Sequence, residues 1–183
     1  MATTTGPNTF LQRLIGAAAL DRAIYEEVEA DEHATLQALG VVILSSVAAG
    51  IGARGFGGNT APHVLFISTI AVLAWAAWAL VTFAVGVRLL PQPQTRSSAG
   101  ELLRTIGFAA TPGCLRVLGV LPGVTTPVFV ITAVWMLAAM IVAVRQALDY
   151  DSTARAVAVC VVGWTLAIAI AIVIGFVFGP TLS

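Results

Sequence analysis

Charged side chains are scarce in this chain. Only 10% of its 183 residues are charged, whereas soluble domains typically carry about 25%. Lysine is missing altogether, so arginine supplies all nine positive charges. A chain this short has too much surface to hide such an excess of apolar residues in a core. The composition therefore excludes an ordinary soluble protein and predicts an all-α integral membrane protein, because lipid forces apolar spans to be helical.

Net charge and reactive residues are also limited. The formal charge is zero, which argues against a nucleic-acid binder, whose surface would carry excess positive charge. The two cysteines, Cys114 and Cys160, lack metal-ligand spacing and lie in apolar segments, which predicts buried side chains. The sequence contains no HExxH, GxSxG or GxxxxGK[ST] motif. We therefore expect no enzyme activity, no cofactor and no bound metal.

Long apolar runs, by contrast, are abundant. Four of them exceed the roughly 18 residues that mark a membrane-spanning candidate, and none contains Asp, Glu, Lys or Arg. They cover residues 34–53, 62–87, 123–144 and 156–178. Each predicts one transmembrane helix. Gly175 and Gly179 in and after the last run form a GxxxG pattern, which fits helix contacts within one chain or in a homo-oligomer.

A fifth stretch, residues 102–121, is apolar but interrupted. Ser98 and Glu101 have the spacing of a capping box, which predicts a helix start directly after Ser98. Pro112 predicts a break or kink, because proline removes a hydrogen bond and disfavours helical geometry at the residue before it. As an α-helix the apolar part covers only about 25 Å, which is marginal for a hydrocarbon core of about 30 Å.

The distribution of arginine indicates whether this stretch crosses the membrane. With five spans and a cytoplasmic N-terminus, seven arginines lie on the inner side, namely Arg13, Arg22, Arg88, Arg96, Arg104, Arg145 and Arg155. Only Arg54 and Arg116 then lie outside. Without the crossing the split becomes six against three, which the positive-inside rule disfavours. The long side chain of Arg116 is expected to reach the headgroups at the outer end of the stretch.

The prediction is therefore a five-helix transmembrane bundle with a kinked third span. Its N-terminus is cytoplasmic and its C-terminus extracytoplasmic, in what we expect to be a bacterial cell (inner) membrane. The transmembrane domain is predicted over residues 34–178, followed by a short tail at 179–183. Its spans are expected at about 34–53, 62–87, 102–121, 125–146 and 154–178.

Residues 1–33 form the predicted cytoplasmic segment. Capping-box spacing at Thr9, an apolar face and then an acidic run predict one helix over residues 9–32. This helix either rests in the headgroup region or packs on its own bundle. The candidate partner-binding residues are Glu26, Glu27, Glu29, Glu32 and His33. The last three are spaced to share one helix face, although they fall short of a full metal site.

Several of these segments resemble the Yip (Ypt-interacting protein) family. The matching features are Gly107–Phe108 followed by Pro112, Trp135 in the next span, the turn 145–151, and the acidic segment before the first span. The resemblance covers roughly residues 25–178. It implies a five-span bundle with a cytoplasmic N-terminus. Eukaryotic members are associated with Rab GTPases, but this chain lacks their long N-terminal region and Asp-Leu-Tyr-Gly-Pro motif, so it is similar to bacterial members.

Two functions follow from these features. The first is a non-catalytic membrane scaffold that binds partner proteins or membrane lipids through its N-terminal segment. The second is a small oligomeric channel or transporter, because a helix broken inside the membrane exposes backbone groups that can bind a substrate. The residues of interest at the break are Gly107, Phe108, Thr111, Pro112, Gly113 and Arg116.

Overall fold

The computed structural model describes residues 8–56, 61–89 and 98–178, and these are almost entirely helical. Two short helices, α1 (Phe10–Ala18) and α2 (Arg22–Ala30), come first. The long helices follow, and they are α3 (Ala34–Gly52), α4 (Ala61–Ala84), α5 (Ala99–Ala109), α6 (Thr125–Ala147) and α7 (Thr153–Phe178). Short helices of other types are η1 (Ala53–Phe56), the π-helix η2 (Val85–Leu89) and the 3₁₀-helix η3 (Thr111–Val120). The expected all-helical fold is confirmed.

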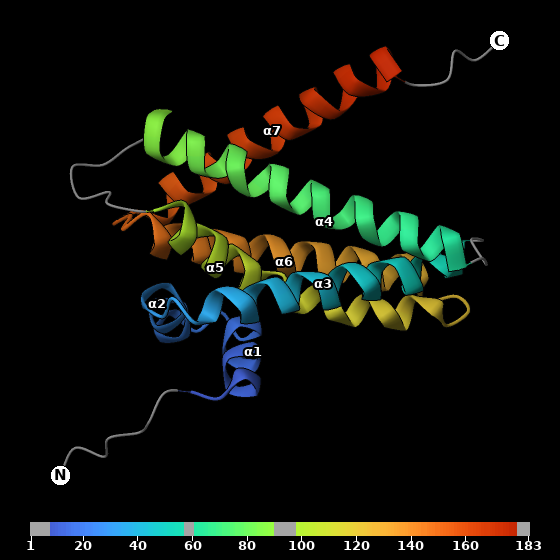
Figure 1. The fold of residues 1–183 in the computed structure, drawn as a ribbon, viewed down its shortest axis with the longest axis horizontal. Coiled ribbons are helices and arrows are strands. Elements are labelled where there is room, and N and C mark those ends of the chain that lie inside the picture. Colours follow the sequence, from blue (N-terminus) through green and yellow to red (C-terminus); the bar gives the residue numbers. More distant parts are fainter. Residues whose placement is uncertain (1–7, 57–60, 90–97, 179–183) are drawn as a thin grey trace.

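The long helices lie side by side and alternate in direction along the chain (Figure 1). The 3₁₀-helix η3 continues the course of α5 and packs most extensively against α3 and α6. Helix α7 packs against α4 and α6. Three helices are long and apolar enough to cross a membrane, namely Ala34–Gly52, Ser68–Arg88 and Thr125–Ala147. The shorter apolar helix Thr153–Leu166 belongs to α7.

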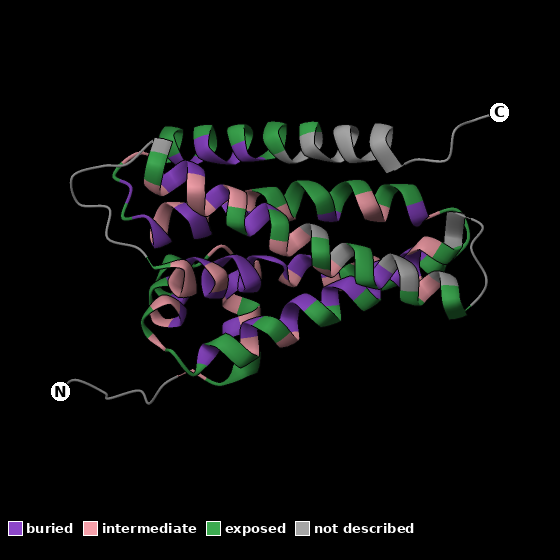
Figure 2. Ribbon diagram, turned by 45° about the horizontal axis from the view of Figure 1, so that its top comes forward, coloured by how far each residue is buried: buried purple, intermediate pink, exposed green. Residues whose placement is uncertain are grey.

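Large apolar side chains cover the outside of the bundle. Leu36 is 79% exposed, Leu65 69% and Val134 64%. Exposed residues alternate with buried ones along the helices, so that each helix keeps one face inward (Figure 2). Patches of this extent would be unfavourable in water, but they are the normal surface of a protein surrounded by lipid. The predicted tail at 179–183, including Gly179 of the GxxxG pattern, lies outside the described residues.

The N-terminal segment differs from the prediction of one helix over residues 9–32. The chain turns at Leu20, whose φ of 64° is left-handed, and α2 begins with Asp21 as its N-cap. The Asp21 side chain accepts a hydrogen bond from the Ala23 amide at 3.0 Å. A short polar side chain that caps a new helix competes with continuation of the old one. The segment is therefore a helical hairpin.

Helix α1 lies crosswise to the long helices and packs on the bundle (Figure 1). The rings of Phe10 and Phe108 meet edge to face at 6.3 Å, and Trp135 Nε1 donates to the Ala18 carbonyl at 2.7 Å. Of the two placements left open by the sequence, packing on the bundle is the one observed. Leu11 and Ile15 remain more than 60% exposed on the other side of α1.

Candidate binding sites at the polar end and at the helix break

Arg13 joins the helical hairpin to the bundle. Its side chain is only 3% exposed, although it belongs to the short helix α1. Its Nη2 atom forms ion pairs with Glu27 at 2.8 Å and Asp31 at 2.7 Å, and Nη1 donates to Gln37 of α3 at 3.0 Å. One guanidinium therefore connects α1, the end of α2 and α3. Because the buried guanidinium is both ion-paired and hydrogen-bonded, it fixes the positions of these three elements relative to one another.

Glu27 is consequently committed to internal contacts. It accepts hydrogen bonds from Asn8 and from Arg13 Nε. Burial acts against ionisation, but the bonds from Asn8 and Arg13 outweigh it and lower the pKa of Glu27. The Arg13 hydrogen bond likewise lowers the pKa of Asp31. Of the predicted partner-binding residues, Glu27 is thus the least available.

Glu29 occupies a more crowded position. Arg104 of α5 donates from Nε to the Val28 carbonyl at 3.2 Å and from Nη2 to the Glu29 carbonyl at 2.5 Å, which ties the C-terminal turn of α2 to the bundle. Burial, together with the negative charges of Asp149 and Glu101, raises the pKa of Glu29 to about 7. The Glu29 carboxyl is therefore partly protonated near neutral pH.

Glu32 and His33 do not share a helix face with Glu29, which corrects the prediction. Helix α2 ends at Ala30, and Asp31 has extended backbone angles, so Glu32 and His33 lie in the turn before α3. Both are exposed. The side chain of Asp31 accepts from the His33 amide at 2.9 Å, which stabilises this turn. No group of three or more potential metal ligands lies together within the described ranges.

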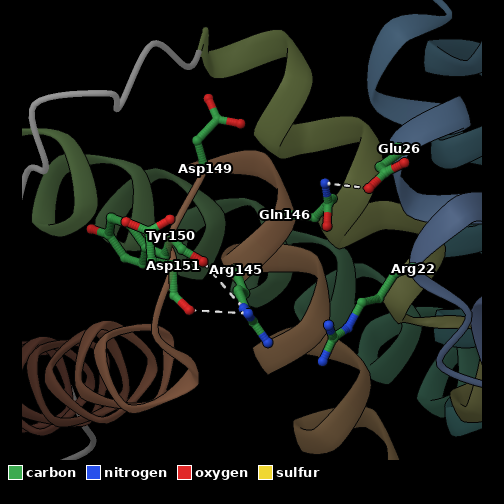
Figure 3. Close-up of a pocket in the computed structure, with 7 residues that line it drawn as sticks. All are labelled: Arg22, Glu26, Arg145, Gln146, Asp149, Tyr150 and Asp151. Atoms are coloured by element: carbon green, nitrogen blue, oxygen red, sulfur yellow. Dashed lines mark hydrogen bonds between the residues drawn. The ribbon is translucent and has the colours of Figure 1, made fainter.

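A polar pocket of about 530 Å³ opens between α2 and the turn that joins α6 to α7 (Figure 3). This end of the molecule is called the polar end below. The residues that line the pocket are Arg22, Glu26, Arg145, Gln146, Asp149, Tyr150 and Asp151. Gln146 donates to the Glu26 carboxylate at 3.1 Å across the pocket. Glu26 is therefore the one predicted partner-binding residue that this pocket includes.

Arg145 holds the turn beneath the pocket. It donates to the carbonyls of Tyr150 at 3.1 Å and Asp151 at 3.0 Å, and to Thr153 Oγ1 at 2.9 Å. The Tyr150 hydroxyl in turn donates to the Gly86 carbonyl at 3.0 Å, within the π-helix η2. These hydrogen bonds fix the turn. Because all the acceptors are neutral, the bonds do not cancel the positive charge of Arg145.

The predicted break after α5 is confirmed. Ser98 and Glu101 form the capping box at the start of α5, and the helix changes to 3₁₀ geometry with Pro112 in its first turn. Thr111 Oγ1 donates to the Phe108 carbonyl at 2.6 Å, and the Gly113 amide donates to the Ala110 carbonyl at 2.9 Å. The break therefore satisfies part of its own hydrogen bonding, as kinks in membrane helices usually do.

Close packing explains the residue types at the break. Phe108 is fully buried. A side chain at Gly107 would collide with Ala38, and one at Gly113 would collide with the Ser45 hydroxyl and with Met136 Sδ. Two glycines thus let α5 and η3 approach α3 closely, which is the general use of small residues between membrane helices.

Arg116 does not reach the end of the bundle, which corrects the expectation for its side chain. Its Nε donates to Thr132 Oγ1 at 3.2 Å, and the guanidinium carbon lies 5.4 Å from the ring centre of Phe129. Both partners belong to α6, and both are neutral. Arg116 also lines a cavity of about 60 Å³ together with Ser45, Ser46 and Trp75. The Phe129 ring and the Thr132 hydroxyl therefore stabilise the positive charge of Arg116, in the role that was expected of the lipid headgroups.

The residues that sequence reasoning missed are those whose partners are distant in the chain. Arg13, Arg22 and Gln146 were not candidate site residues, yet they form the ion pairs and the pocket at the polar end. The local sequence did not indicate the burial of Arg13, because apolar residues of the same segment, Leu11 and Ile15, stay exposed. Arg145 stood out only through its position in the 145–151 turn.

In the part of the chain that the structure describes, an apolar helical bundle carries a polar pocket at one end, which defines the class as helical membrane proteins. The model of the Yip1 domain family matches residues 21–174, and the chain belongs to this family. The Yip1 family is not known as an enzyme family. The comparisons with curated proteins and with solved structures gave no match.

Proposed function

We propose that the chain is a non-catalytic membrane scaffold that binds partner proteins or lipid at its polar end and crosses the bilayer five times. The geometry of the third stretch supports the crossing. Within the predicted span, the eight α-helical residues 102–109 cover about 12 Å, and ten residues of η3 cover about 20 Å because a 3₁₀-helix rises about 2.0 Å per residue. The sum exceeds the hydrocarbon thickness of about 30 Å.

The observation that carries the scaffold proposal is the fixed position of the acidic hairpin. Arg13 and Arg104 fasten it to α3 and α5, while Glu26, Glu32 and His33 stay exposed. A rigid charged surface costs little conformational entropy when a partner binds. We propose that its partners present basic segments, and that the hairpin faces the cytoplasm of a bacterial cell, where the arginine-rich side belongs.

Photo-crosslinking tests this surface in intact cells. A photoreactive residue at position 32 should yield a defined crosslinked partner, and the substitutions Glu26→Gln or His33→Ala should reduce its yield. The matched control is the same residue at position 126, which is exposed at the opposite end of α6. Equal crosslinking at both positions, or none at position 32, would contradict the scaffold proposal.

The channel or transporter hypothesis is not favoured. The hydrogen bonds of Thr111 and Gly113 satisfy groups that a transport site would leave open to its substrate. The cavity beside Arg116, at about 60 Å³, has room for about two water molecules. We therefore propose no transported substrate.

A further inference from the structure

The polar pocket adjoins a second, smaller cavity of about 50 Å³ on its apolar side. The two cavities share three lining residues, Arg22, Arg145 and Gln146. The smaller cavity adds Ile141 and Val142, which lie about one helical turn before Arg145 and therefore deeper in the bundle. Since α6 is a candidate span that ends at Ala147, this junction lies where hydrocarbon gives way to headgroups.

Two positive charges are located at the junction. Arg145 makes its hydrogen bonds to two carbonyls and a hydroxyl, and Arg22 is exposed at the start of α2. The ion pairs found among the described residues both belong to Arg13. Arg22 and Arg145 therefore line both cavities without a carboxylate at ion-pair distance in the part of the chain that the structure describes. In Figure 3 their guanidinium groups point to the same side of the pocket.

Negative charge is confined to the larger pocket. Glu26, Asp149 and Asp151 line it, and none of the three lines the smaller cavity. Burial is the main reason why the pKa of Glu29 is raised, and the negative charges of Asp149, Glu101 and Glu26 raise it further while Arg104 opposes them. From the bundle outward the order is thus apolar side chains, then guanidinium groups, then carboxylates.

This order matches one class of molecule. We propose that the pocket binds the headgroup of a phospholipid with a primary amine, such as phosphatidylethanolamine. An acyl chain lies along Ile141 and Val142, the phosphate lies at Arg22 and Arg145, and the ammonium lies at Glu26. The site deepens the proposed scaffold function, because it names the lipid that the polar end recognises.

The Glu26 carboxylate selects among headgroups. A primary ammonium has three N–H donors, which the Glu26 carboxylate can accept, whereas the trimethylammonium of phosphatidylcholine has none. Phosphatidylglycerol has no cation at this position and would place its net negative charge near the Glu26 carboxylate. The arginines interact with the phosphate that all three lipids share. Phosphate binding and amine selection are therefore separable by mutation.

The test uses the full-length protein in detergent, freed of lipid and titrated with each lipid while bound lipid is counted by native mass spectrometry. Phosphatidylethanolamine should bind about tenfold more tightly than phosphatidylcholine or phosphatidylglycerol, the effect of one charge-assisted hydrogen bond. Arg22→Gln should weaken all three lipids. Glu26→Gln should weaken phosphatidylethanolamine alone and bring it within about threefold of phosphatidylcholine.

Arg155→Gln is the matched control for Arg22→Gln, because Arg155 is exposed at the same end but lines neither cavity. Tightest binding of phosphatidylglycerol, or unchanged binding in Arg22→Gln, would overturn the site. If inorganic phosphate displaced the lipid at concentrations similar to that of the lipid, the arginines would be assigned to free phosphate. That result would also overturn the lipid site. Crosslinking at position 32 is a separate measurement, so loss of the partner with lipid selectivity intact contradicts the scaffold proposal alone.

Discussion

At the scale of single residues, Arg13 determines whether the helical hairpin stays on the bundle. We expect Arg13→Gln to lower the free energy of unfolding by about 2 kcal/mol, because Glu27 and Asp31 lose their cation while remaining partly buried. Limited proteolysis should then cut between α2 and α3, and thermal unfolding in detergent measures the loss of stability. Arg155→Gln, at an exposed position of α7, is the control. Equal effects of the two substitutions would contradict the role of Arg13.

Glu29 provides a test that depends on pH. Its pKa is raised to about 7 from an ordinary 4.5, so the folded protein binds this proton more tightly than the unfolded chain. The contribution of Glu29 to stability is therefore fully present below about pH 4.5 and is lost as the pH rises through about 7. Glu29→Gln should remove this part of the slope and stabilise the protein by about 1–2 kcal/mol at pH 8, a value reduced for solvent screening.

Thermal unfolding between pH 4.5 and pH 8 measures the effect of Glu29. The charged groups around it are Asp149, Glu101, Glu26 and Arg104, and they are unchanged in the variant. Glu32→Gln, at an exposed position, should keep the slope of the original protein. A variant at position 29 that keeps the full slope would show that another group titrates in this range.

At the scale of elements, the passage from α5 into η3 depends on close contact with α3. Gly113→Ala should destabilise the protein by about 1–3 kcal/mol, because the new methyl group meets the Ser45 hydroxyl and Met136 Sδ. Gly40→Ala is a matched control within α3, since no atom lies within 4 Å of the added carbon. It should be neutral or slightly stabilising, as expected for Gly to Ala in a helix. Thermal unfolding of the pair in one detergent measures both, and equal losses would contradict the packing at Gly113.

At the scale of the whole molecule, the five proposed crossings place the chain ends on opposite sides of the membrane. In a variant without Cys114 and Cys160, a cysteine introduced at Ser183 should react with a membrane-impermeant maleimide in intact cells. A cysteine at Thr4 should react only after the cells are opened. Equal labelling of both positions would remove the third crossing and the assignment of the polar end to the cytoplasm.

Local patterns predicted what depends on neighbouring residues. The capping boxes at Thr9 and Ser98 and the break at Pro112 are present, because each is decided within one or two helical turns. The single helix over residues 9–32 was wrong, because Asp21 caps a new helix and Leu20 accepts a left-handed conformation. The pocket at the polar end could not be predicted, because Arg22 and Arg145 are far apart in the sequence.

The sequence alone determined that this protein is a membrane-embedded helical bundle of the Yip1 family, since lipid leaves apolar segments with few alternatives to a helix. The tertiary structure decided which charges meet. It buried Arg13 between two carboxylates, directed Arg116 to Thr132 and Phe129, and left Arg22 and Arg145 beside the polar pocket. The physical reason is that helix formation depends on local hydrophobicity, whereas the pairing of charges depends on contacts between residues distant in the chain.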